Sequence, residues 1–278
     1  MNQLVMGKVV IAGAGPGDPE LITIKAANYL QKADVILTDR LVSHEILEQY
    51  AAANAEIIQV GKQSGRGSST PQAHINELMV LHAKQGKLVV RLKGGDISVF
   101  SNILDELETL IKHQIPYILI PGITAASGAA AYSGIPLTAR KYSNSVRFLT
   151  CHQYETFSSD YWQELAQTDD TLVMYMSGEG LDIVVQRLIE NGISIDKEIA
   201  IIDQATTPMQ SVTVFNINNY NQMKHHLASP TLIIIGKVVA LHHQFKWLKN
   251  CHTDQSYFKP VEGKIIVCEE EVKELLTA

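Results

Sequence analysis

The chain has 278 residues, of which 46% are hydrophobic and 19% are charged, so it is long enough to form one large or two ordinary globular domains with a sizeable core. Its formal net charge of −6 disfavours a general nucleic-acid binder, because such proteins carry basic surfaces. We expect a cytoplasmic protein without a membrane partner or a metal site, since there is no signal-peptide pattern, no apolar run of spanning length and no pairing pattern among Cys151, Cys251 and Cys268.

The chain begins with a strand, a glycine-rich turn and a helix. An apolar run at residues 8–12 leads into residues 13–17, where glycine stands at every second position, and Asp18 and Pro19 follow as a helix N-cap and first helical residue. A GxGxxG dinucleotide motif counted from Gly13 would need glycine where Asp18 stands. An acidic cap also makes a poor phosphate site, so the turn favours a ligand other than phosphate. The alternative is a turn that is merely tight.

Strands and helices alternate through the first half of the chain. The expected strands are Lys8–Ala12, Val35–Thr38, Glu56–Val60, Leu88–Leu92 and Tyr117–Ile120. The expected helices are Pro19–Lys32, His44–Tyr50, Pro71–Gln85, Asn102–His113 and Thr124–Ser133. This alternation predicts an α/β fold with a mostly parallel, doubly wound sheet, in which ligands bind beyond the carboxyl ends of the strands.

A second α/β domain is predicted after a linker. Residues 134–145 contain glycine, proline and small polar residues, so we place a domain boundary between residues 1–138 and 139–243. The expected strands here are Val146–Cys151, Thr171–Met176, Glu198–Ile202, Gln210–Asn216 and Thr231–Gly236, and the expected helices are Ser159–Ala166, Leu181–Asn191 and Asn219–Leu227. A short loop between the strands at 199–202 and 212–215 predicts a hairpin, and therefore a mixed sheet.

The pattern weakens in an extension at residues 244–278, to which we assign no role. A strand at Val261–Cys268 and a short helix at Glu269–Leu276 are expected there.

The loops that follow the strands carry a series of motifs in a fixed order. They are Gly13-Ala14-Gly15-Pro16-Gly17-Asp18-Pro19-Glu20-Leu21, Asp39-Arg40-Leu41-Val42-Ser43, Val60-Gly61-Lys62, Pro71-Gln72 with Ile75-Asn76, Val90-Arg91-Leu92-Lys93-Gly94-Gly95-Asp96, Pro121-Gly122-Ile123-Thr124-Ala125-Ala126-Ser127 and Tyr132-Ser133-Gly134-Ile135-Pro136-Leu137-Thr138. Together they resemble the tetrapyrrole methyltransferases, and within that family the enzymes that C-methylate uroporphyrinogen III. The resemblance covers about residues 7–243.

The resemblance implies a homodimer of two-domain α/β chains, with S-adenosylmethionine bound in a cleft between the domains and S-adenosylhomocysteine as the product. It implies methylation of two carbons of uroporphyrinogen III to give precorrin-2, on the way to sirohaem or cobalamin. The implied methyl-donor contacts are Pro16, Gly94, Gly95, Asp96, Val99, Thr124, Ala125, Met176 and Ala205. Asp39 and Lys62 match the pair assigned as proton acceptor and proton donor.

The chemistry of such a reaction fits these residue types. A pyrrole carbon that gains a methyl group becomes part of a cationic ring, and a carboxylate such as Asp39 can take the ring proton or stabilise the cation; a solvated aspartate paired with Arg40 is the alternative. Lys62 either donates a proton or binds a substrate carboxylate, and the second role fits better because an unperturbed lysine is a weak acid at neutral pH. The polyanionic substrate needs cations, and the candidates are Arg40, Arg66, Arg91, Lys93 and Arg140.

The loop backbone offers further contacts to the methyl donor. Glycines allow close approach of a ligand, free N–H groups at the Gly122–Thr124 turn can hold a carboxylate, and Asp96 can face an ammonium group or ribose hydroxyls.

The sequence also departs from the family, and the departures concern the acceptor. The usual Pro, aromatic, aliphatic, Phe, Gly, Arg, Gly run after Asp96 is Ile97-Ser98-Val99-Phe100-Ser101-Asn102-Ile103. We expect residues 101–103 of this run to start the next helix earlier. A usual histidine is Ala139, and a usual glycine is Ala205. Two alternatives therefore stay open: a methylase of the same fold that acts on a later precorrin or other acceptor, and a non-catalytic paralogue that binds donor or tetrapyrrole. The intact Asp39 and Lys62 favour catalysis.

Overall fold

The structure is a computed structural model of the chain. It describes residues 6–60, 70–176, 180–222, 229–251, 253, 255–258 and 264–265. The chain divides into two compact units, Met1–Thr124 with Phe258–Ala278 and Ala125–Tyr257. This division lies ahead of the predicted linker at 134–145, because helix α5 (Ala125–Ser133) packs three of its alanines into the core of the second unit.

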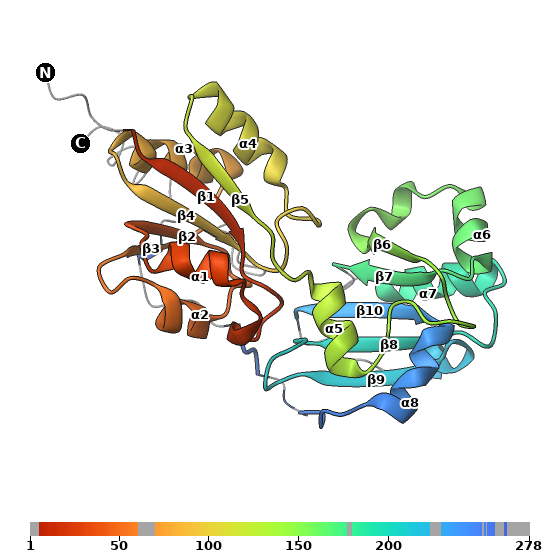
Figure 1. Cartoon of the computed structure of the whole chain (residues 1–278). Helices are drawn as coiled ribbons and strands as arrows, with labels where there is room; N and C mark the ends of the chain where they lie inside the picture. The colour runs from red at the N-terminus through yellow and green to blue at the C-terminus, as the bar shows by residue number, and fades with distance from the viewer. Residues whose placement is uncertain are drawn as a thin grey trace, which may run out of the picture. The chain divides into compact units, whose positions relative to one another are not determined.

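The first unit contains a parallel sheet with helices on both faces (Figure 1). Its strands are β1 (Lys8–Gly13), β2 (Val35–Thr38), β3 (Glu56–Gln59), β4 (Leu88–Lys93), β5 (Tyr117–Ile120) and β11 (Lys264–Ile265). The strand order is β11-β3-β2-β4-β1-β5, and every neighbouring pair runs parallel. The predicted parallel sheet is therefore confirmed.

Helices cover this sheet in two layers. They are η1 (Pro19–Leu21), α1 (Ile24–Leu30), α2 (His44–Tyr50), α3 (Gln72–Lys84) and α4 (Ile103–Lys112). Helices α3 and α4 share a core with Val9 and Ile11 of β1, whereas α1 and α2 share the opposite core with Val10 and Ala12. Because successive strand residues point to opposite faces, a strand buried on both faces reads as a continuous apolar run.

One predicted helix, Pro19–Lys32, is divided into η1 and α1. The Asp18 side chain accepts a hydrogen bond from the Glu20 N–H at 2.9 Å and starts η1, with Pro19 next to it as expected. The Thr23 hydroxyl then accepts from the Ala26 N–H at 3.2 Å and starts α1. Two successive N-caps therefore start two short helices where the apolar periodicity predicted one.

The second unit contains a mixed sheet, as predicted. Its strands are β6 (Val146–Thr150), β7 (Thr171–Tyr175), β8 (Glu198–Asp203), β9 (Ser211–Asn216) and β10 (Thr231–Gly236), in the order β6-β7-β10-β8-β9. Strands β6 and β7 run parallel and the other pairs run antiparallel. The β8–β9 pair is the predicted hairpin.

Helices also pack on both faces of the second sheet. Besides α5 they are η2 (Cys151–Thr156), α6 (Ser159–Gln167), α7 (Leu181–Glu190), η3 (Ile217–Gln222), η4 (Lys237–Leu241) and α8 (His242–Phe245). Helices α6 and α7 share one core with the sheet, and α5 and η4 share the other. The helix predicted at Asn219–Leu227 is described only as η3, and residues 223–228 lie outside the described residues. None of the helices in the described ranges is long and apolar enough to cross a bilayer.

The C-terminal extension packs on the second unit as far as Tyr257. The Trp247 indole N–H donates to the Ala131 carbonyl at 2.9 Å, and Asn250 forms hydrogen bonds with both the N–H and the carbonyl of Val212. Of the strand predicted at Val261–Cys268 the structure describes β11, and the helix predicted at Glu269–Leu276 lies outside the described residues.

Candidate functional site

Three loops at the carboxyl ends of strands in the first unit meet backbone to backbone. Beyond the paired ends of β1 and β4, the Gly15 N–H donates to the Gly95 carbonyl at 3.1 Å and the Gly95 N–H donates back at 2.8 Å. A Cβ atom added to Gly13 would lie 2.6 Å from both the Gly122 nitrogen and the Gly95 carbonyl oxygen. A Cβ atom added to Gly122 would likewise lie 2.3 Å from the Gly95 carbonyl oxygen. Contact between the loops therefore requires glycine at residues 13 and 122, whereas the sequence argument explained the glycines by the approach of a ligand.

Gly13→Ala is expected to destabilise the protein by about 1–3 kcal/mol, because the added methyl group meets rigid backbone and the loops must move apart. Urea unfolding measures this change. Gly192→Ala measures a different cost, because its Cβ would meet nothing within 4 Å and the loss of about 1–2 kcal/mol comes from placing alanine at a φ of +77°. An unchanged free energy of unfolding for Gly13→Ala would contradict the role of the loop contact.

Asp96 joins two of these loops. Its Oδ2 atom accepts from the Gly122 N–H at 2.9 Å, and its Oδ1 atom accepts from the Ser98 N–H at 2.8 Å and from the Ser98 hydroxyl. Burial by itself raises the pKa of Asp96, but the hydrogen bonds from Ser98 and Gly122 outweigh it and lower the pKa below its ordinary value. The Gly122 N–H, which we expected to be available to a ligand carboxylate, is thus used by Asp96.

The lowered pKa of Asp96 predicts a specific acid sensitivity. Its ionised form stabilises the fold above the ordinary pKa of 3.8, and this stabilisation is lost as the pH falls through the lower pKa of the folded state. Asp96→Asn should therefore show a shallower loss of unfolding free energy than the unmodified protein between about pH 5 and pH 3. Urea unfolding across this range tests it, with the exposed Asp160→Asn as the control. A parallel dependence for Asp96→Asn and the unmodified protein would contradict the assignment.

A buried network of charges holds Asp39, which directly follows β2. The Asp39 Oδ1 atom accepts from Arg91 Nη2 at 2.6 Å, and Arg91 Nε donates to Glu106 Oε1 at 2.9 Å. Lys93 Nζ donates to both Glu106 oxygens, at 2.9 and 3.0 Å. The Glu106 side chain is 0% exposed and that of Arg91 is 3% exposed, whereas that of Asp39 is 28% exposed. The network balances two cations with two carboxylates, and Asp39 is its exposed member.

The carboxylates set the charge of this network. Burial disfavours the charged form of Arg91, but Asp39 and Glu106 outweigh that effect and raise its pKa. Burial and the neighbouring Arg91 charge lower the pKa of Lys93. Asp39 is thus paired with Arg91, whereas the sequence alternative paired it with Arg40. Arg91 and Lys93 were expected to bind substrate, and in the structure their donors contact carboxylates inside the first unit.

Sequence reasoning missed Glu106. It lies on the buried side of α4, together with Ile103, Leu107 and Leu110. A glutamate three residues after Ile103 and four before Leu110 falls on the apolar stripe of a helix, and that spacing was the available signal.

The remaining predicted residues are divided between the units. In the first unit Pro16, Gly94, Gly95, Val99, Thr124 and Arg40 are half-buried, and all lie in loops that follow strands. In the second unit Ala125 is half-buried at the start of α5, Ala205 is buried, and Arg140 and Met176 are exposed. Met176 directly follows β7 with a φ of +55°. Lys62 and Arg66 lie outside the described residues.

The loop at residues 97–103, which departs from the family pattern, closes on itself. Phe100 and Asn102 have φ values of 50° and 51°, in the left-handed region. The Ser101 hydroxyl donates to the Ile97 carbonyl, and the Asn102 side chain donates to Asp105 Oδ2 at 2.9 Å. Helix α4 begins at Ile103 with Asn102 as its N-cap, one residue after the predicted start at Asn102.

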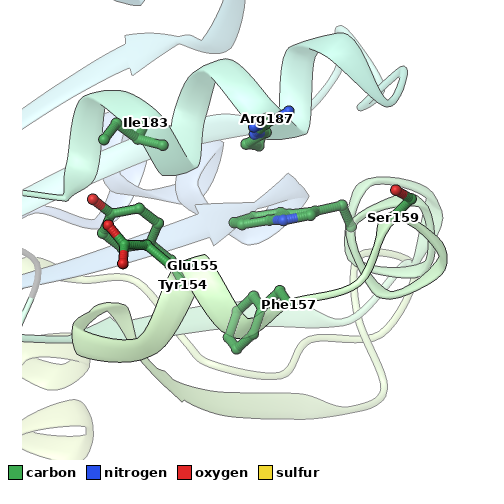
Figure 2. A pocket seen from close by; sticks show the side chains of 7 residues that line it. Tyr154, Glu155, Phe157, Ser159, Ile183 and Arg187 are labelled. Atoms are coloured by element: carbon green, nitrogen blue, oxygen red, sulfur yellow. The ribbon is translucent and has the colours of Figure 1, made fainter.

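The second unit contains a pocket of about 400 Å³ between η2, α6 and α7. Figure 2 shows its lining residues, which are Tyr154, Glu155, Phe157, Ser159, Trp162, Ile183 and Arg187. It includes none of the predicted site residues. In the described part of the chain, no group of three His, Cys, Asp or Glu side chains is placed to hold a metal ion.

Residues 8–220 match the family model for tetrapyrrole (corrin/porphyrin) methylases. The chain belongs to the tetrapyrrole methylase family. This membership confirms the resemblance found in the loop motifs.

Individual relatives agree with the family assignment. A siroheme synthase of Acinetobacter baylyi is 46% identical over 87% of this chain, and the chain spans about half of that relative, 53% of its length. The structure of uroporphyrin-III-C-methyltransferase from Thermus thermophilus matches with a TM-score of 0.73 and 31% identity, over 88% of this chain and 99% of the other. Another structure of the Thermus thermophilus enzyme, complexed with S-adenyl homocysteine, matches with a TM-score of 0.71.

Proposed function

We propose that the chain transfers methyl groups from S-adenosylmethionine to two carbons of uroporphyrinogen III and so forms precorrin-2. The observation that carries this proposal is the match to the Thermus thermophilus uroporphyrin-III-C-methyltransferase, which extends over 99% of that chain. The complex of that enzyme with S-adenyl homocysteine supports the choice of methyl donor.

The donor-binding role falls to the strand-end loops. Pro16, Gly94, Gly95 and Val99 combine partly exposed backbone and side chains at the carboxyl end of a parallel sheet, where α/β proteins bind ligands. Asp96 shapes this surface by joining the loops after β4 and β5. When bound, S-adenosylmethionine supplies an electrophilic methyl group on a sulfonium. Thr124, Ala125, Met176 and Ala205 are further proposed donor contacts.

Asp39 is the proposed catalytic residue. Addition of a methyl group leaves a positive charge on the pyrrole ring, and a ring proton must then leave. A carboxylate that is fixed by Arg91 but 28% exposed can stabilise that charge and accept that proton.

Cationic side chains hold the substrate in this proposal. Arg40, Arg140 and Arg66 bind its carboxylates, and Lys62 does the same or donates a proton. Arg91 and Lys93 contribute through the buried network, because their side chains pair with Asp39 and Glu106. The siroheme synthase relatives support a place on the sirohaem branch. We further propose a cytoplasmic homodimer, on the family resemblance alone.

A second candidate is methylation of a later precorrin or another acceptor. The loop at 97–103 favours it, because the family arginine is Asn102 and its side chain bonds to Asp105. A non-catalytic paralogue is the third.

One pair of measurements separates these candidates: transfer of labelled methyl groups to enzymatically generated uroporphyrinogen III, and calorimetry with the donor. Transfer supports the first. Donor binding without transfer contradicts it and favours another acceptor, and no donor binding favours the paralogue.

A further inference from the structure

We propose that Arg91 is a positioning residue that orients the Asp39 carboxylate for proton removal, and that Glu106 fixes Arg91 for this task. The inference rests on the proposed function, because it concerns the same reaction.

The guanidinium of Arg91 is held at each of its nitrogens. Nη2 donates to Asp39 Oδ1 at 2.6 Å, Nε donates to Glu106 Oε1 at 2.9 Å, and Nη1 lies 3.4 Å from the Leu37 carbonyl oxygen and 3.3 Å from that of Leu92. Because the guanidinium is planar and rigid, these contacts fix the direction in which Nη2 points. The position of Asp39 Oδ1 is therefore fixed by the buried groups that hold Arg91.

Glu106 is itself fixed. It comes from α4, is fully buried, and accepts from Lys93 Nζ at both oxygens as well as from Arg91 Nε. Lys93 and Arg91 are two positions apart on β4 and therefore point to the same face of the sheet. Lys93 therefore holds the Glu106 carboxylate in place, and it does so from the same strand, β4, that carries Arg91.

The exposure of the network indicates where it acts. Arg91, Lys93 and Glu106 are buried, and Asp39 alone among the four carries an exposed surface. Without Asp39 the other three would leave one positive charge buried, so the Asp39 carboxylate balances the charge of the network at its exposed end. Among the described residues, the hydrogen bond to Asp39 falls on Oδ1, which leaves Oδ2 for the substrate.

A double-mutant cycle on the full chain tests the proposal. Arg91→Met is expected to lower kcat about 10²-fold, the effect of a small misplacement of a catalytic group, and to leave the KM for S-adenosylmethionine within about twofold. When Arg91→Met is added to Asp39→Asn, kcat should fall by less than about threefold further, because the basic carboxylate that Arg91 orients is already absent. Arg147→Met, at an arginine paired with Glu164 and Asp170 in the second unit, is the control and should leave kcat unchanged.

An equal loss of kcat from Arg91→Met in both backgrounds would overturn the proposal, since a purely structural residue acts independently of Asp39. If circular dichroism shows that Arg91→Met does not fold, Arg91→Lys goes through the same cycle. Lysine keeps the charge but lacks the planar fork that binds both carboxylates. We therefore expect Arg91→Lys to lower kcat about tenfold in the unmodified protein and to leave kcat unchanged when Asp39→Asn is also present. The proposed function fails differently: the unmodified protein would then transfer no methyl group to uroporphyrinogen III.

Discussion

Asp39→Asn is expected to lower the turnover of uroporphyrinogen III by about 10²–10⁴-fold, the usual contribution of a positioned acid or base. Asparagine keeps an oxygen that can accept from Arg91 Nη2, so the network geometry is retained while the negative charge and the basic oxygen are lost. The affinity for S-adenosylmethionine should stay unchanged, because Asp39 is not among the donor contacts. Initial rates and calorimetry measure the two quantities separately.

The control for Asp39→Asn is the same substitution at Asp160, an exposed aspartate in the first turn of α6. It should leave both turnover and donor affinity as they are. An unchanged rate for Asp39→Asn would remove this carboxylate from the mechanism, and a loss of donor affinity equal to the loss of rate would assign it to binding.

Glu106→Gln is expected to lower the free energy of unfolding by about 3–5 kcal/mol, the typical cost of breaking a buried ion pair from one side. Glu106 is fully buried between Arg91 and Lys93, so its neutral replacement leaves two buried cations facing one carboxylate, that of Asp39. Urea unfolding at neutral pH measures the change.

Glu164→Gln is the matched control, because Glu164 also accepts from an arginine at 2.6 Å but its side chain is 56% exposed. Exposed pairs contribute at most about 1 kcal/mol, so the two variants should differ clearly. Similar losses would mean that burial adds nothing to the network around Glu106.

The sequence predicted the strands of the two sheets closely. Val35–Thr38, Tyr117–Ile120 and Thr231–Gly236 have the predicted bounds. Each is a short apolar run between turn residues, which is a strand pattern. Val35–Thr38 is buried as this pattern predicts, whereas Tyr117–Ile120 at the edge of the sheet exposes Tyr117 and Leu119. The break between η1 and α1 was missed because Thr23 interrupts no apolar spacing, although threonine is a preferred N-cap.

The sequence could predict where the residues of the candidate site lie in the fold, but not which side chains they contact. The strand-end loops could be read in order, and Asp39 could be placed at the end of a strand. Its partner could not, because Arg91 lies 52 residues further along and reaches Asp39 only through the pairing of β2 with β4. Glu106 depends on how α4 packs against the sheet, and sequence spacing could indicate only that its side faces the core.

The most direct test of the account is the mass of the tetrapyrrole formed when the full chain is incubated with uroporphyrinogen III and S-adenosylmethionine. We predict a product that has gained two methyl groups, with one S-adenosylhomocysteine released for each. An acceptor recovered without added methyl groups, from a protein that binds the donor in calorimetry, would contradict the account.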